Sequence, residues 1–218
     1  QGSDRCLVSW HPSAVAVTFR SSDNKDNWLS NLKAIRHAPN EVLEHGRMHK
    51  GFYQAGSAFI PALRDAIGKL RADRQIPVSF FGHSRGGPLA MFAAFALRNI
   101  FPVLDVITFG APRWCDKVLA REYDMALGAR TIKVVNNNDI VPHLPPWRLG
   151  WQHVGRLWYI DRRGRVSRDV HTLPFWDRFM GRVEDLGRPG LDAVKDHSGD
   201  NLSAYLDPLL AAVGRDET

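Results

Sequence analysis

Apolar residues follow two different spacings along the chain, and their alternation predicts strands and helices. The apolar, β-prone runs Ala14–Phe19 and Val103–Phe109 are short, which is typical of buried strands. From Gly51 to Arg71 the apolar residues recur every three or four positions, which predicts a long helix with one buried face. Pro61 within this segment predicts a kink or a break, because proline lacks the N–H that a helix uses.

The middle of the chain continues the alternation and indicates the fold class. Strands are expected at Pro77–Phe81 and Thr131–Val135, and helices at Pro88–Leu97 and Lys117–Leu127. Strands that alternate with helices are joined by crossovers, so we expect an α/β fold with a mostly parallel central sheet and helices on both faces. At the amino end, Cys6–Trp10 is expected to pair as a hairpin with the next strand.

Outside this middle section the pattern changes. Asn27–Ile35 has apolar residues at helical spacing and predicts a short amphipathic helix. Arg156–Asp161 and Arg165–Arg168 are expected to form a hairpin, and further helices are expected at Phe175–Asp185 and Asn201–Val213.

Length and composition predict a single soluble domain over residues 1–218. Single cores seldom grow beyond ~250–300 residues, and the chain has 218, of which 44% are hydrophobic and 24% charged. No apolar stretch approaches the ~20 residues of a membrane-spanning helix. No amino-terminal segment resembles a signal peptide. The compartment stays open, and a secreted mature form is one alternative.

The two cysteines, Cys6 and Cys115, are too few for a disulfide framework and too far apart in sequence for a metal motif. Two buried thiols are the favoured interpretation, and a disulfide between them stays an alternative. We expect neither a metal ion nor an organic cofactor.

The formal net charge of +6 favours anionic partners, such as acidic lipid headgroups. Much of the excess lies in six arginines: Arg148, Arg156, Arg162, Arg163, Arg165 and Arg168. Because no aromatic residues are interleaved as in RNA-binding segments, we expect no nucleic-acid partner. A solvated basic face is the favoured interpretation.

The clearest chemical motif is the G-x-S-x-G sequence Gly82–Gly86, which places Ser84 directly after a predicted strand and before a predicted helix. In such an elbow the serine occupies a strained turn that projects its hydroxyl above the sheet. The start of the following helix offers backbone N–H groups to a developing negative charge. This context favours a catalytic nucleophile over a merely structural turn.

A nucleophilic serine needs a base and an acid that orients the base. In this fold the acid and then the histidine follow the serine in the chain. Asp139 is the favoured acid, because it lies in the loop just beyond a predicted strand, at the sheet edge where such sites are built. Four downstream histidines stay open as the base on this reasoning: His143, His153, His171 and His197.

Five segments carry further recognisable motifs: Val15–Leu32, Met48–Ala55, Val78–Gly87, Thr108–Arg113 and Val134–Pro146, with a histidine before the last predicted helix. In this order they resemble the class 3 lipases, the fungal-type family within the α/β-hydrolases. The resemblance runs from about Ala14 to Leu210 and is least familiar over Gln152–Arg188.

The resemblance implies a triad of Ser84, Asp139 and His197. It also implies an oxyanion hole formed by Ser22 and the backbone N–H of Arg85, the second of which follows from the elbow itself. Arg85 departs from the family pattern, where a neutral residue is common, and places a cation beside the nucleophile.

In fungal members the helix after the oxyanion serine is a lid, which here corresponds to residues 23–35. Its apolar face consists of Trp28, Leu29, Leu32 and Ile35. Trp28, Leu29 and Leu32 are the candidate substrate-binding residues, and packing of this face into the core is the alternative. Its first half, Asp23–Asn27, is polar, so we expect it to insert poorly into an oil surface.

The leading functional hypothesis is a serine lipase or carboxylesterase that acts on acylglycerols or related lipid esters, with transient lipid-interface contact and a monomeric state. A phospholipase or a feruloyl-type esterase on the same scaffold is the enzymatic alternative. An inactive hydrolase-fold binding module is the alternative from another class, and the intact Ser84, Asp139 and His197 count against it.

Overall fold

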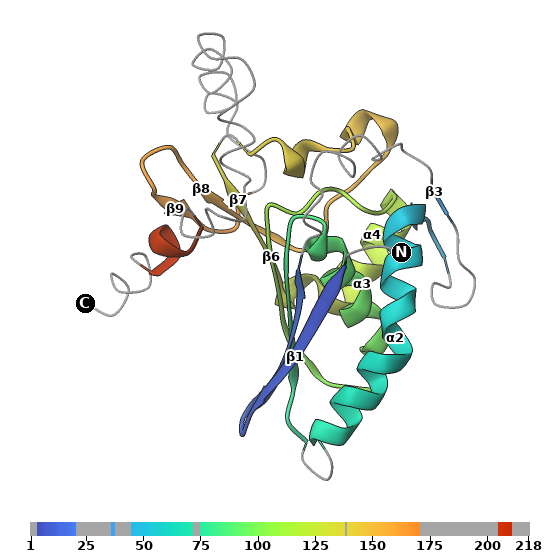
Figure 1. Cartoon of the computed structure of the whole chain (residues 1–218). Coiled ribbons are helices and arrows are strands. Elements are labelled where there is room, and N and C mark those ends of the chain that lie inside the picture. Colours follow the sequence, from blue (N-terminus) through green and yellow to red (C-terminus); the bar gives the residue numbers. More distant parts are fainter. Residues whose placement is uncertain are drawn as a thin grey trace.

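The computed structural model describes residues 4–20, 36–37, 45–71, 75–137, 139–170 and 205–210. Within them a seven-stranded sheet has the order β1-β2-β5-β6-β7-β8-β9 (Figure 1). Its strands are β1 (Arg5–His11), β2 (Ala14–Arg20), β5 (Val78–His83), β6 (Val103–Phe109), β7 (Thr131–Asn136), β8 (Arg156–Ile160) and β9 (Val166–Ser167). The strands from β2 to β8 are parallel, and antiparallel hairpins close both edges. The predicted mostly parallel sheet and both predicted hairpins are confirmed. A separate short pair joins β3 (Arg36–His37) to β4 (Met48–His49).

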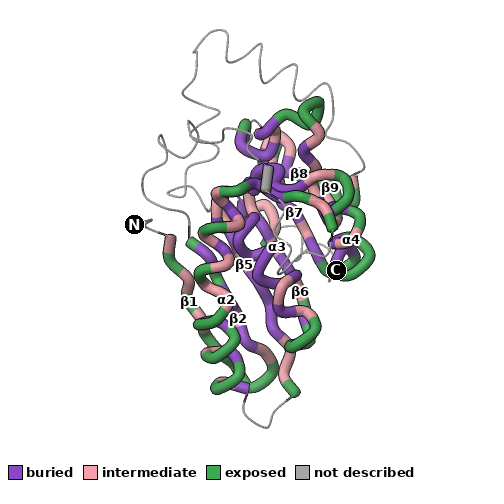
Figure 2. Tube along the Cα trace, turned by 90° about the vertical axis from the view of Figure 1, so that its right-hand side faces the viewer, coloured by how far each residue is buried: buried purple, intermediate pink, exposed green. Residues whose placement is uncertain are grey.

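In the described part of the chain three helices cover one face of the sheet: α2 (Lys50–Arg71), α3 (Gly86–Leu97) and α4 (Lys117–Leu127). The central helix α3 is apolar on nearly all sides and is buried along most of its length (Figure 2). A helix of this composition is stable only when it is enclosed, and α3 contacts the sheet below and both neighbouring helices. Together they form the main core with the side chains of β2 and β5, such as Val17 and Phe80.

A short helix at residues 205–210 lies against the opposite face of the sheet (Figure 1). Tyr205 and Leu209 pack there with Val134 and Ile160 in a second, smaller core. Helices therefore occupy both faces, as predicted, but the two layers are unequal within the described residues. This second layer matters for the site because Tyr205 lies beneath the loop that follows β7.

Of the kink or break predicted at Pro61, the long helix α2 excludes the break. It runs without a break from Lys50 to Arg71, with Pro61 in its interior. The reason is orientation: Pro61 is exposed, so the helix carbonyl that loses its N–H partner can be hydrated.

Three predicted helices fall wholly or partly outside the described residues: Asn27–Ile35, Phe175–Asp185, and all of Asn201–Val213 except 205–210. None of the helices in the described ranges combines the length and apolar character needed to cross a membrane. Cys6 and Cys115 are free thiols, the first partly and the second fully buried. Burial raises the pKa of Cys6 to about 11 and that of Cys115 well above its usual value.

Candidate active site

Ser84 occupies the sharp turn between β5 and α3, with a backbone φ of 55°. A non-glycine residue in this region is uncommon and strained, so its neighbours have to hold it there. The Ser84 N–H donates to the Phe109 carbonyl at 2.8 Å, and the Gly87 N–H donates to the Ser84 carbonyl at 3.0 Å. The residue is 2% exposed, which places its hydroxyl in a sheltered position. The predicted elbow is confirmed as a structure.

The glycines around Ser84 are required by close backbone approaches. A Cβ on Gly82 would lie 2.2 Å from the Gly86 carbonyl oxygen, so β5 and α3 would have to separate. A Cβ on Gly86 would lie 2.3 Å from the Phe19 carbonyl oxygen, so α3 could not approach β2. The G-x-S-x-G spacing therefore has a steric cause here, independent of any resemblance.

Arg85, the next residue, stands at the N-cap of α3, where backbone N–H groups lack helical partners. Its guanidinium forms a two-pronged ion pair with the Asp4 carboxylate, at 2.9 and 2.8 Å. Both side chains are mostly buried. The cation that the sequence placed beside the nucleophile is therefore neutralised by Asp4, and the pair also fastens the amino-terminal segment to the elbow.

Asp139 is completely buried in the loop after β7. Its Oδ1 accepts from the Val141 N–H at 2.9 Å, and its Oδ2 accepts from the Tyr205 hydroxyl at 2.5 Å. Because β5, β6 and β7 are adjacent and parallel, Ser84 and Asp139 follow carboxyl ends that are two strands apart, roughly 10 Å. The serine and aspartate side chains cover part of this distance, and an imidazole ring with a hydrogen bond at each end can bridge the rest.

Tyr205, like Asp4, is a residue at the site that the sequence analysis did not single out. It is fully buried and makes edge-on ring contacts with His83 and Phe109. Its signal in the sequence is the helical spacing of apolar residues around it, since Leu202 precedes it by three positions and Leu209 follows it by four. A tyrosine on an apolar face usually needs a buried partner for its hydroxyl, and that partner is Asp139.

Two of the four candidate histidines lie in the described residues. His153 Nε2 lies 2.7 Å from the Pro142 carbonyl oxygen, and its Nδ1 is shielded from solvent with no hydrogen-bond partner among the described residues. Burial, together with the nearby charges of Lys133 and Arg113, holds the pKa of His153 well below its usual range. These features indicate a neutral structural histidine. His143 lies in the 3-10 turn η2 (Val141–His143), and its carbonyl accepts from the Arg113 guanidinium.

Several predicted site residues lie outside the described residues, so their placement stays a prediction: His171, His197, Ser22, Trp28, Leu29, Leu32 and the lid segment 23–35. Among the residues that are described, no three His, Cys, Asp or Glu side chains form a group able to hold a metal ion.

Comparison with known proteins places this geometry in a family. The family described as lipase (class 3) matches residues 16–149. A secreted mono- and diacylglycerol lipase of Fusarium solani is 29% identical over 183 residues, which cover 83% of this chain and 54% of the relative. A chloroplastic phospholipase A(1) of Arabidopsis thaliana is 27% identical, with 78% and 40% covered. The solved structure of a Rhizomucor miehei lipase–propeptide complex superimposes with a TM-score of 0.71 at 24% identity, covering 82% of this chain and 61% of that one.

The family match spans more than half of the chain, so the chain belongs to the class 3 lipases. The structural superposition confirms the α/β fold class. The chain spans about half the length of the curated relatives it matches.

Proposed function

We propose that this chain is a carboxylic ester hydrolase that acts on acylglycerols or related lipid esters. The observation that carries the proposal is the strained, sheltered Ser84 two parallel strands away from the buried, doubly hydrogen-bonded Asp139. Membership in the class 3 lipases supports it, as do relatives named for mono- and diacylglycerol hydrolysis.

In the proposed mechanism Ser84 attacks the ester carbonyl while His197 takes its proton and then returns it to the leaving alcohol. Asp139 fixes the tautomer of the imidazole and stabilises its charged form. The Arg85 N–H and Ser22 donate to the oxyanion, and each such donor typically lowers the barrier by ~3 kcal/mol. Water then hydrolyses the acyl-enzyme by the same steps.

A phospholipase is the second candidate, and the exposed arginines of the β8–β9 hairpin favour it, because they match an anionic headgroup. The similarity to a chloroplastic phospholipase A(1) agrees with this candidate. Release of free fatty acid from matched diacylglycerol and phosphatidylglycerol substrates separates the two.

The first test concerns the substrate's physical state. We expect the rate of tributyrin hydrolysis to rise smoothly to saturation across the solubility limit, with good turnover of dissolved short-chain esters. The reason is that Asp23–Asn27 resists burial, since unpaired polar groups are costly to desolvate. The four apolar residues of the lid face would supply only a few kcal/mol at ~25 cal/mol per Å². A sharp upturn at the limit would instead identify 23–35 as a working lid and favour long-chain lipids.

The second test concerns Tyr205. Tyr205→Phe removes one donor to the Asp139 carboxylate, so we expect kcat to fall about tenfold while KM for a soluble ester stays nearly constant. The matched control is Tyr123→Phe on α4, which removes an equally buried hydroxyl that contacts Thr131 at 2.9 Å. The control should lower the melting temperature without lowering kcat. Equal losses of kcat in both variants would show that Tyr205 acts only through stability.

A further inference from the structure

Arg85 carries a long cationic side chain on the residue whose backbone N–H is the proposed donor to the oxyanion. Its backbone lies in the right-handed helical region, with a φ of −53° and a ψ of −32°, and its side chain does not cap α3. A guanidinium on a flexible stem beside the nucleophile could turn either toward the ester or toward the protein. In the structure it turns toward Asp4.

The order of the strands explains how Asp4 reaches the elbow. β1 is antiparallel to β2, and its first residue, Arg5, pairs with Arg20, the last residue of β2. Asp4 therefore lies at the carboxyl edge of β2, and β2 is the parallel neighbour of β5, which ends at the elbow. The first turn of α3 packs against β2 at the same edge, through the close approach of Gly86 to the Phe19 carbonyl.

Burial distinguishes the pair of Arg85 and Asp4 from another two-pronged pair, that of Arg156 and Asp169. The two hydrogen bonds are short in each pair, at 2.9 and 2.8 Å at the elbow and at 2.7 and 2.8 Å on the β8–β9 hairpin. The side chains are 21% and 9% exposed at the elbow but 44% and 52% exposed on the hairpin. A sheltered two-pronged pair fixes the orientation of the guanidinium, whereas water competes for the donors of an exposed pair.

The peptide that carries the proposed oxyanion donor therefore lies between two fixed points. On one side, Ser84 is held at a φ of 55° by the backbone hydrogen bonds that it makes with Phe109 and Gly87. On the other side, the Arg85 side chain is held by Asp4. An oxyanion hole is most effective when its donors are already in place, because loose donors have to be ordered during the reaction.

We propose that Asp4 is a positioning residue of the oxyanion hole and that it acts through Arg85. Its carboxylate holds the guanidinium away from the ester, and it thereby limits the movement of the peptide whose N–H would bind the oxyanion. The inference rests on the proposed function, because it assigns Asp4 a role in that reaction. It also accounts for a cation next to the nucleophile: the cation is the contact through which the start of β1 holds the elbow.

The first experiment compares Asp4→Asn with the unmodified chain on a soluble neutral ester, well below the melting temperature. Asparagine has nearly the same volume but lacks the charge that holds the guanidinium. We expect kcat to fall about tenfold with KM nearly unchanged. The affinity for an alkyl boronic acid, which forms a tetrahedral adduct with the serine, should fall about equally. Asp4→Glu keeps the carboxylate and should retain more kcat than Asp4→Asn, whereas a packing role predicts the reverse order.

The second experiment asks whether Asp4 acts through Arg85. Arg85→Leu keeps the backbone N–H and removes the guanidinium, so Asp4→Asn should have no further effect on kcat in this background. The double variant should melt at a higher temperature than Arg85→Leu alone, because a buried carboxylate without its partner costs more than an amide. Losses of kcat that multiply in the double variant would show that Asp4 acts by another route.

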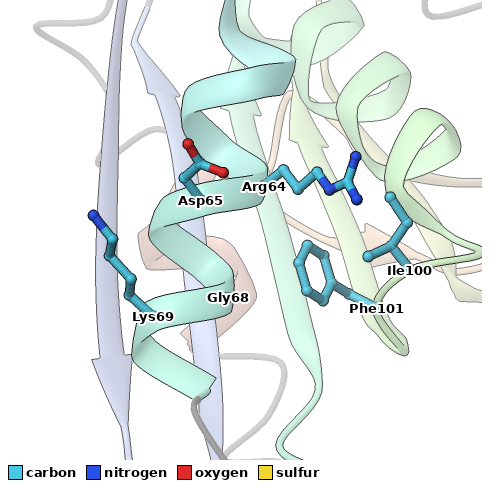
Figure 3. A pocket seen from close by; sticks show the side chains of 6 residues that line it. All are labelled: Arg64, Asp65, Gly68, Lys69, Ile100 and Phe101. Atoms are coloured by element: carbon cyan, nitrogen blue, oxygen red, sulfur yellow. The ribbon is translucent and has the colours of Figure 1, made fainter.

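Two variants at the opposite edge of the sheet are the controls. Asp169→Asn breaks the exposed pair and should leave kcat and the melting temperature nearly unchanged. Arg71 is a buried arginine of α2 with its guanidinium carbon 5.2 Å from the centre of the Phe101 ring, and Phe101 lines the hollow shown in Figure 3. Phe101 precedes β6, whereas the elbow follows the carboxyl end of the parallel strand β5. Arg71→Leu should therefore lower the melting temperature without lowering kcat.

Three results would overturn the proposal. A lower melting temperature of Asp4→Asn without a loss of kcat would show that the pair only fastens the amino end. A rise in kcat would show that the freed guanidinium stabilises the oxyanion. Equal losses of kcat in Asp4→Asn and Arg71→Leu would assign the effect to general destabilisation.

A failure of the proposed function is distinguishable from a failure of this inference. In that case the unmodified chain would neither turn over an ester nor bind the boronic acid. Hydrogen exchange of the Gly82–Gly86 amides then decides the role of Asp4, since Asp4→Asn should speed exchange there and Arg71→Leu should not. Unchanged exchange in Asp4→Asn would show that Asp4 does not order the elbow.

Discussion

Replacing Ser84 with alanine is expected to lower kcat for soluble esters by at least about ten-thousandfold, because the acyl-enzyme can no longer form. Residual catalysis over water would come only from the oxyanion hole and from binding. The fold should persist, since alanine needs the same φ of 55° as serine and the surrounding backbone hydrogen bonds remain. The measurement is turnover of a short-chain ester, with labelling by a fluorophosphonate probe as a second readout.

The matched control is Ser79→Ala on β5, the strand that leads to the nucleophile; Ser79 lies five residues before Ser84 and is also buried. This variant should keep both turnover and probe labelling. If Ser84→Ala retained more than a small fraction of the activity, the assignment of Ser84 as nucleophile would be wrong. If the unmodified chain neither reacted with the probe nor hydrolysed esters, the inactive binding module would be favoured instead.

The sequence pattern predicted the strand and helix that position Ser84, because the spacing of apolar residues and the glycines of a tight turn are features of short segments. The helix predicted at Lys117–Leu127 has the same bounds as α4. The strand predicted at Thr131–Val135 ends one residue before β7 does. The helix after the elbow begins two residues earlier than predicted, at Gly86, since the glycines themselves form its first turn. The glycines predicted the turn because each stands where two backbone segments approach too closely for a side chain.

The contacts that tune the site could not be predicted in this way, because they join residues far apart in the chain. Asp4 is 81 positions from Arg85, and Tyr205 is 66 positions from Asp139. No spacing rule links such pairs, and only the sheet order brings them together. The break that was one of the two outcomes expected at Pro61 does not occur, because the cost of proline depends on whether its face of the helix is solvated.

The second large effect is expected for His197. His197→Ala should lower kcat/KM for a soluble ester about as much as Ser84→Ala, because without a base the serine hydroxyl is a weak nucleophile. The double variant should be little worse than either single one, since triad members act as a unit. If the fold-loss in the double variant equalled the product of the two single fold-losses, the two residues would act independently.

The remaining histidines provide the controls for this assignment. His153 is tied to the Pro142 carbonyl and has a strongly lowered pKa, so His153→Ala should affect stability more than turnover. We expect the same of His143→Ala, because the backbone of this residue, rather than its ring, takes the hydrogen bond from Arg113 that holds the loop. His171→Ala should change stability or substrate binding at most. A severe loss of kcat confined to one of these three, with His197→Ala near wild type, would reassign the base and require that histidine to reach between Ser84 and Asp139.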